Sequence, residues 1–161
     1  MESILEIRDL RLAFPSFGGL QPALNGVSLQ VAAGEIVGLV GESGSGKSVT
    51  AMTALRLLPK GSFLIQGGGI RFRGQDILAL SEADMREVRG RDISMIFQEP
   101  MTALNPTRRI GRQMEEVIRR HQPLSGAQAR ERAIQLLSEV HIADAPRLLE
   151  RYPFELSGGM R

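Results

Sequence analysis

The chain has 161 residues, which is enough for one domain with its own hydrophobic core. Its 20 Lys and Arg residues stand against 18 Asp and Glu residues, a net charge of +2, so no basic excess indicates a nucleic-acid partner. The sequence contains no Cys, which excludes disulfides, thiolate metal ligands and cysteine nucleophiles within these residues.

The first predicted elements are strands. Apolar and polar residues alternate over residues 4–14 and again over residues 27–31, which is the pattern of half-buried strands in an antiparallel layer. Residues 36–40 differ, because four of these five residues are apolar: Ile36, Val37, Leu39 and Val40. A nearly continuous apolar run predicts a strand buried on both faces.

A glycine-rich loop follows this run. The stretch GESGSGKS, residues 41–48, fits the pattern G-x-x-x-x-G-K-[ST]. Its glycines allow backbone conformations that are closed to other residues and let amide groups approach phosphate oxygens closely; they are Gly41, Gly44 and Gly46. Lys47 supplies a mobile positive charge for the β- and γ-phosphates, and Ser48 supplies a hydroxyl group for Mg²⁺.

The context of this loop supports nucleotide binding. Residues 48–58 predict a helix that Pro59 ends, so a strand, the loop and a helix occur in the required order. The alternative is a chance match in a surface turn, and the flanking strand and helix disfavour it.

Further elements follow in chain order. Residues 67–77 predict a hairpin, and Ser81 with Asp84 predicts a capped short helix through Val88. Residues 92–98 predict another strand. Two helices are then predicted over residues 108–121 and 125–140, and Ser125 and Gln128 open the second at capping-box spacing.

The change of composition marks a boundary near Gln98. Residues 1–97 are expected to form a partial nucleotide-binding α/β core with an antiparallel β layer. Residues 98–161 are expected to form a helical subdomain that begins at Gln98.

Two later stretches narrow the class. IFQEPMTALNP puts Gln98 at the end of the predicted strand, and ELSGGMR puts Ser157 at a predicted helix start. Either stretch alone is weak, because a Gln after a strand is usually solvated and LSGG could be a turn. Together with the glycine-rich loop, they resemble the P-loop, Q-loop and LSGG signature of the ATP-binding subunits of ABC transporters, in the same order. The resemblance runs from about Leu5 to Arg161, and GESGSGKSVT, QEPMTALNP and YPFELSGGMR are similar to the oligopeptide, dipeptide and nickel importer ATPases.

The resemblance implies an α/β fold, the P-loop NTPase core of the ABC ATPase type, with an antiparallel β layer and a helical subdomain. It also implies ATP and Mg²⁺ as cofactors. The implied ATP-binding residues are Phe14, Gly41, Glu42, Ser43, Gly44, Ser45, Gly46, Lys47, Ser48 and Val49. Phe14 would stack on adenine, although it could be a core residue and Phe17 is a rival. Val49 stands where many relatives have a second hydroxyl residue, so backbone groups would contact the α-phosphate.

Two further groups receive roles from the resemblance. Gln98, which joins Lys47 as a catalytic candidate, would contact Mg²⁺ and the attacking water, and Ser48 would also bind Mg²⁺. The signature residues would face the nucleotide held by a second subunit; they are Leu156, Ser157, Gly158, Gly159 and Met160.

Some of the family's motifs are not in these residues. The Walker B strand, the D-loop and the switch His are expected after Arg161, while His121 and His141 come too early and are expected on helix surfaces. Without the Walker B carboxylates, the 161 residues are expected to show no ATP turnover. Residues 36–40 are also expected to have an unpaired backbone and exposed apolar side chains, and residues 157–161 to be frayed.

The resemblance also implies partners and a location. The parent protein would couple ATP binding and hydrolysis to the import of peptides or a related solute. It would work with a second ATP-binding subunit, transmembrane permease subunits and, indirectly, an external solute-binding protein, at the cytoplasmic face of the inner membrane. The first ten residues carry charges where a signal peptide would need an apolar run, and no segment approaches the roughly 20 apolar residues of a membrane span, so the chain itself is expected to be soluble. The alternatives are a non-hydrolytic nucleotide-binding fragment and a soluble ABC-type regulator without a permease.

Overall fold

A computed structural model describes residues 3–98 and 103–160 of the chain. The chain divides into two compact units, residues 1–93 and residues 94–161. Across the described residues, no helix combines the length and the apolar character that crossing a membrane requires.

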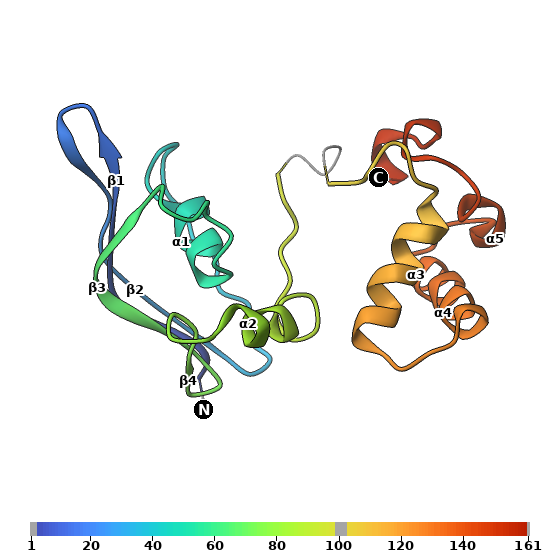
Figure 1. The fold of residues 1–161 in the computed structure, drawn as a ribbon, viewed down its shortest axis with the longest axis horizontal. Coiled ribbons are helices and arrows are strands. Elements are labelled where there is room, and N and C mark those ends of the chain that lie inside the picture. Colours follow the sequence, from blue (N-terminus) through green and yellow to red (C-terminus); the bar gives the residue numbers. More distant parts are fainter. Residues whose placement is uncertain (1–2, 99–102, 161) are drawn as a thin grey trace. The chain divides into compact units, whose positions relative to one another are not determined.

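The first unit is built on an antiparallel sheet with the strand order β2-β1-β3-β4 (Figure 1). Its strands are β1 (Ser3–Ser16), β2 (Gly19–Ala32), β3 (Leu64–Phe72) and β4 (Gln75–Asp76). Leu12 of β1 lies opposite Leu24 of β2, and Ile7 lies opposite Ile70 of β3. The sheet confirms the antiparallel layer and the hairpin that the sequence predicts.

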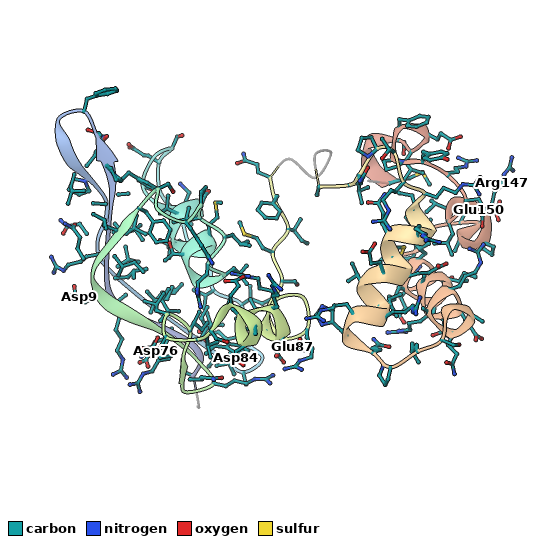
Figure 2. All side chains as sticks on the ribbon, viewed as in Figure 1. Asp9, Asp76, Asp84, Glu87, Arg147 and Glu150 are labelled. Carbon is teal, nitrogen blue, oxygen red and sulfur yellow. The ribbon has the colours of Figure 1, made fainter. Side chains whose placement is uncertain are left out.

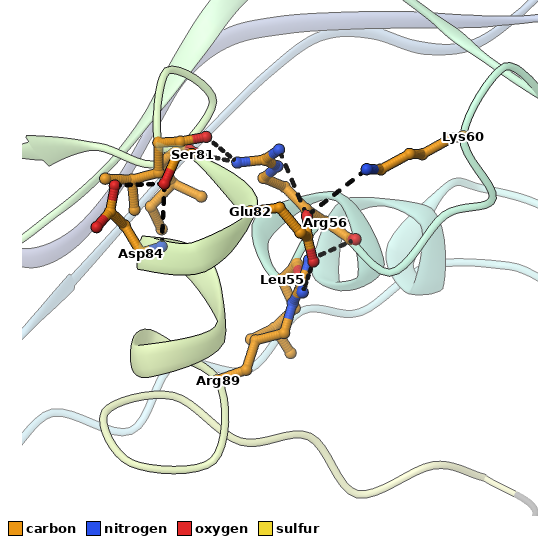
Figure 3. A network of polar contacts seen from close by, with 9 residues as sticks. Leu55, Arg56, Lys60, Ser81, Glu82, Asp84 and Arg89 are labelled. Carbon is orange, nitrogen blue, oxygen red and sulfur yellow. Dashed lines mark hydrogen bonds and ion pairs between the residues drawn. The ribbon is translucent and has the colours of Figure 1, made fainter.

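Two short helices complete this unit. Helix α1 (Lys47–Ala54) and helix α2 (Glu82–Val88) pack their apolar residues with one face of the sheet. The buried core consists of Ile7, Leu10, Leu12, Leu24, Ala54, Leu58, Ile70, Ile77 and Met85. The predicted cap of α2 is present near Asp84, which is labelled in Figure 2. The Ser81 hydroxyl accepts a hydrogen bond from the backbone N–H of Asp84 at 3.1 Å and donates one to its carboxylate at 2.6 Å (Figure 3).

Helix α1 ends earlier than predicted. It stops at Ala54, and Arg56 adopts a φ of 51°, so Pro59 does not end the helix. The end is a local turn: the N–H of Arg56 donates to the carbonyl oxygen of Thr53 at 3.0 Å, and the N–H of Leu57 donates to that of Met52 at 2.8 Å. Just past the helix, the guanidinium group of Arg89 donates hydrogen bonds to the carbonyl oxygens of Leu55 at 2.7 Å and Arg56 at 2.9 Å (Figure 3). These carbonyls lie beyond the last helical residue, and Arg89 supplies the donors that a continuing helix would have given them.

Two predicted strands are wrong for this structure. Residues 35–42 form no strand, and the side chains of Ile36 and Val40 are 99% and 94% exposed. Residues 94–97 also form no strand, and the only pairing near them among the described residues is a single bridge between Arg89 and Ile93. An apolar run becomes a buried strand only when neighbouring strands hydrogen-bond to it. The expectation that residues 36–40 are unpaired and exposed is therefore confirmed.

The second unit is helical. Its elements are α3 (Ile110–His121), α4 (Gly126–Glu139), α5 (Ala145–Leu148) and two 3₁₀ turns, Pro153–Glu155 and Gly158–Met160. Both long helices were predicted, and the capping box of Ser125 and Gln128 is confirmed. His141 corrects one expectation, because it follows α4 in a turn with a φ of 59° rather than lying on a helix. The core of this unit consists of Ile110, Ile118, Ala129, Ala133, Leu137, Ala145, Leu148, Leu149 and Leu156.

Candidate nucleotide-binding site

The glycine-rich loop leads directly into α1. Gly46 is the N-cap of the helix and Lys47 is its first residue. The ammonium group of Lys47 turns back over the loop and donates hydrogen bonds to the carbonyl oxygens of Gly41 at 2.7 Å and Glu42 at 2.6 Å, and to the Ser45 hydroxyl at 3.2 Å. The loop therefore curves around the side chain of its own lysine, and the positive charge lies beside its backbone.

Gly46 makes the turn into the helix possible. Its φ is 91°, in the left-handed region that favours glycine. A Cβ atom at this position would lie 2.7 Å from Cδ2 of Leu24 and 3.0 Å from the carbonyl oxygen of Ala23. Strand β2 therefore packs directly against the loop at Gly46. No sequence motif predicts this contact, because Ala23 and Leu24 are ordinary apolar residues.

The start of α1 offers backbone donors rather than side-chain caps. Among the described residues, no side chain caps this end of the helix, and its first turn contains no acidic residue. The Thr50 hydroxyl is buried and donates to the carbonyl oxygen of Gly46 at 2.9 Å, so it is engaged within the helix. Free N–H groups and the positive end of the helix dipole favour a phosphate group at this position.

Most of the other predicted loop residues face solvent. The side chains or backbone of Glu42, Ser43, Gly44 and Ser45 are exposed, as is Ser48 on the first turn of α1. Val49 packs against the hydrophobic core. Its side chain is therefore used for packing in this chain.

The exposed hydroxyl of Ser48 fits a magnesium ion that is held mainly by nucleotide phosphates and water, as this ion often is. Within the described ranges, no three His, Asp or Glu side chains gather in a way that could hold a metal ion.

The two aromatic candidates for adenine have different surroundings. Phe14 lies on β1 opposite Gln21, is half-buried and packs against the core of the first unit. Phe17 lies between β1 and β2 and is fully exposed.

The remaining predicted site residues lie in the second unit. Gln98 is exposed and lies in a bend rather than at a strand end, and residues 99–102 of the stretch QEPMT lie outside the described residues. Leu156 is only 5% exposed and belongs to the core of the unit, whereas Ser157 and the residues that follow it to Met160 are exposed. Leu156 therefore anchors the segment, and Ser157–Met160 present backbone and hydroxyl groups to solvent.

One group of residues near this segment has no sequence motif. Arg109 Nη1 donates a hydrogen bond to Glu150 Oε2 at 2.5 Å, and its guanidinium carbon lies 5.8 Å from the centroid of the Tyr152 ring. The two ends of the ion pair are 41 residues apart, so no local pattern predicts it.

Comparisons with known proteins agree with these features. The profile of the ABC transporter family matches residues 24–161. The chain is 60% identical over 160 residues to the probable D,D-dipeptide transport ATP-binding protein DdpD of Escherichia coli, covering 99% of the chain and 49% of that protein. It is 45% identical over 161 residues to the dipeptide transport ATP-binding protein DppD of Bacillus subtilis, covering 100% of the chain and 48% of that protein. The chain spans about half the length of the curated relatives it matches.

Solved structures show the same fold. The dimeric bacterial ABC transporter cassette MJ0796 superimposes with a TM-score of 0.80 at 23% identity, covering 97% of this chain and 64% of that one. A post-hydrolysis state of the same cassette with bound ADP and phosphate gives the same TM-score of 0.80. The chain therefore has the α/β fold of an ABC ATPase cassette, with an antiparallel β layer and a helical subdomain.

Proposed function

The chain belongs to the ABC transporter family, and from this premise we propose that it is the N-terminal part of an ATP-binding subunit of a peptide importer. The observation that carries the proposal is the position of Lys47. Its ammonium group lies within 2.7 Å of two carbonyl oxygens of the loop, directly before the free N–H groups of α1. A triphosphate offers the strongest acceptors for this set of donors.

The residues of the loop would divide the work of binding. The backbone N–H groups of residues 44–48 would hold the β-phosphate, and Lys47 would exchange the carbonyl oxygens of Gly41 and Glu42 for phosphate oxygens. Val49 cannot donate a hydrogen bond from its side chain, so contacts to the α-phosphate would come from the backbone. Phe14, which is half-buried on β1, would stack on adenine.

Magnesium would be bound by Ser48 and by Gln98. The carbonyl oxygen of the Gln98 side chain is a suitable ligand for this ion and can orient a water molecule, but an amide is not a base at neutral pH. The resemblance assigns the general base to a Walker B carboxylate, which these 161 residues do not contain. We therefore expect the 161 residues alone to bind ATP without turnover.

The parent protein would act as a pair of ATP-binding subunits. Ser157–Met160, which are exposed, would face the nucleotide of the second subunit, and closure of the pair would move transmembrane permease subunits. This arrangement would hold the protein at the cytoplasmic face of the membrane through the permease. We propose peptides as the imported solute because the relatives are named as dipeptide and oligopeptide transport proteins.

The experiment that tests this proposal is a calorimetric titration of the 161-residue chain with ATP and Mg²⁺. We expect saturable binding of one ATP per chain and no release of phosphate above background. No saturable binding would contradict the role of the loop, and phosphate release that disappears in Lys47→Ala would contradict the expected lack of turnover. Copurification of the longer parent protein with permease subunits tests the transport role.

A further inference from the structure

We propose that Arg109 is a positioning residue for the signature segment: it fastens the residues that lead into Ser157 to the first turn of α3. The lead-in is defined as residues 149–155. The inference rests on the proposed function only in that it assumes that Ser157–Met160 serve a nucleotide. The physical coupling itself is a property of the second unit.

The backbone joins the lead-in to the start of α3. The N–H of Ile110 donates to the carbonyl oxygen of Arg151 at 2.9 Å, and the N–H of Gly111 donates to that of Leu149 at 2.8 Å. These are donors of the first turn, which have no acceptor inside their own helix. A Cβ atom on Gly111 would lie 2.9 Å from the carbonyl oxygen of Leu149, so the close approach depends on glycine.

The side chain of Arg109 closes the same junction. It is the N-cap residue of α3, and its guanidinium group pairs with Glu150 and lies over the ring of Tyr152. The ring of Tyr152 in turn stacks on that of Phe154, with centroids 5.5 Å apart and planes 8° from parallel. Contacts with Tyr152 and Glu150 raise the pKa of Arg109, which favours its charged form. One side chain thus contacts two positions of the lead-in at once.

The signature segment depends on this junction for its place. Leu156 is the buried anchor, and beyond it the described residues form a single 3₁₀ turn that Met160 N–H closes on the Ser157 carbonyl oxygen at 3.0 Å. The exposed turn has little packing of its own. The orientation of this turn is therefore set by the position and direction of the lead-in that precedes it.

The other side of α3 is fixed to the segment that precedes it. The Gln113 side-chain amide donates to the carbonyl oxygens of Asn105 and Arg108, both at 2.9 Å, and its oxygen accepts the N–H of Asn105 at 2.9 Å. The first turn of α3 is therefore bonded on one side to residues 105–108 and on the other to the lead-in. A shift of residues 105–108 would be passed to Ser157–Met160 through this turn, by its backbone hydrogen bonds and by the side chain of Arg109.

The molecule contains a matched comparison for Arg109. Glu150 also accepts a hydrogen bond from Arg130 at 2.6 Å, and Arg130 pairs with Glu115 of α3 at 3.5 Å. Arg130→Gln therefore removes the ion pair to the same carboxylate and a second one to α3, without touching Tyr152. Arg112 lies one turn further along α3 and makes no ion pair within the described ranges. If the loss of any positive charge loosened the segment, then Arg109→Gln, Arg130→Gln and Arg112→Gln would all have the same effect. If Arg109 positions the segment, only Arg109→Gln would have it.

The test is hydrogen exchange of the 161-residue chain without nucleotide, followed by mass spectrometry. In Arg109→Gln we expect the amides of residues 152–160 to exchange about fivefold faster, while those of α4 stay unchanged. Arg130→Gln and Arg112→Gln should leave residues 152–160 close to the wild-type rate. Arg109→Lys keeps the charge for Glu150 but not the flat group over Tyr152, so it should restore part of the protection.

Two results would overturn the proposal. One is an unchanged rate at residues 152–160 in Arg109→Gln. The other is an equal increase across α3, α4 and the lead-in, which would make the residue a general stabiliser. If Arg109→Gln does not fold, the exchange rates of residues 152–160 in Arg109→Lys and Arg130→Gln are compared instead. Faster exchange in Arg109→Lys alone would support the proposal, and equal rates in the two variants would overturn it. Because no nucleotide is present, failure here leaves ATP binding by the loop standing, and failure of ATP binding leaves the junction standing.

Discussion

The ammonium nitrogen of Lys47 lies 2.6 Å from the carbonyl oxygen of Glu42, so the lysine closes the loop that carries it. A positive charge at this point has backbone dipoles as partners and lies at the start of α1. We expect Lys47→Ala to weaken ATP binding about tenfold or more, because charge-assisted hydrogen bonds to the phosphates are lost. Adenosine, which lacks phosphates, should lose little affinity in the same titration.

The control for this change is Lys60, the other lysine of the chain. Lys60 is exposed and its ammonium group is 4.0 Å from a carboxylate oxygen of Glu82, outside the loop. Lys60→Ala should leave ATP affinity unchanged. Equal losses for ATP and adenosine in Lys47→Ala would show that Lys47 does not contact the phosphates.

A second prediction concerns the contact between the loop and β2. Gly46→Ala should destabilise the first unit by about 3 kcal/mol, because the new methyl group meets Leu24 and Ala23 and the residue has a positive φ. Gly44→Ala is the matched control: its φ is 83°, but a Cβ atom there meets nothing within 4 Å. It should cost only the backbone term of about 1 kcal/mol. Urea unfolding of both variants measures the difference, and equal losses would mean that β2 does not support the loop.

A third prediction concerns the end of α1. Arg89 binds Glu82 at 2.6 Å as well as the carbonyl oxygens of Leu55 and Arg56 (Figure 3). Arg89→Ala should lower the free energy of unfolding of the first unit by on the order of 2 kcal/mol, because these partly buried acceptors lose their donors. Arg89→Lys should rescue little, since an ammonium group lacks the planar fork. Arg86 is an exposed residue of α2, the helix that Arg89 follows directly, and Arg86→Ala should leave the melting temperature unchanged. An equal loss of stability in Arg86→Ala would contradict the role of Arg89 at the end of α1.

A fourth prediction concerns pH. Hydrogen bonds from Arg130 and then Arg109 lower the pKa of Glu150 below its ordinary value, and those from Arg89 lower the pKa of Glu82 in the same way. A carboxylate whose pKa is lower in the folded state stabilises the fold fully above its unfolded pKa. That stability is lost as the pH falls from about 5 through the folded pKa.

The measurement is the urea midpoint of the second unit at pH 7 and at pH 3. Glu150→Gln should lower the midpoint at pH 7 and reduce its dependence on pH, because the titrating group is gone. Glu131→Gln, on α4 and without an ion pair in the described part of the chain, should keep the wild-type pH dependence. An unchanged slope in Glu150→Gln would show that its ion pairs do not contribute.

The sequence by itself determined the features that depend on local chemistry. The alternation of residues 4–14 predicted β1, because period two places one face of a strand against the core. Ser125 and Gln128 predicted the start of α4, since a capping box satisfies its donors within four residues. The loop at residues 41–48 leads into α1 as its spacing of glycine, lysine and hydroxyl residues predicts, and phosphate binding by this loop stays a prediction.

The tertiary structure decided what depends on partners far along the chain. Residues 36–40 have the composition of a buried strand, yet they remain exposed because a strand exists only through hydrogen bonds to neighbours. Helix α1 ends at Ala54 and not at Pro59, and the carbonyl oxygen of Leu55 just past its end accepts a hydrogen bond from Arg89, which lies 34 residues further along the chain. The junction of Arg109 with Glu150 spans 41 residues, and only the packing of α3 against the lead-in brings the two charges together.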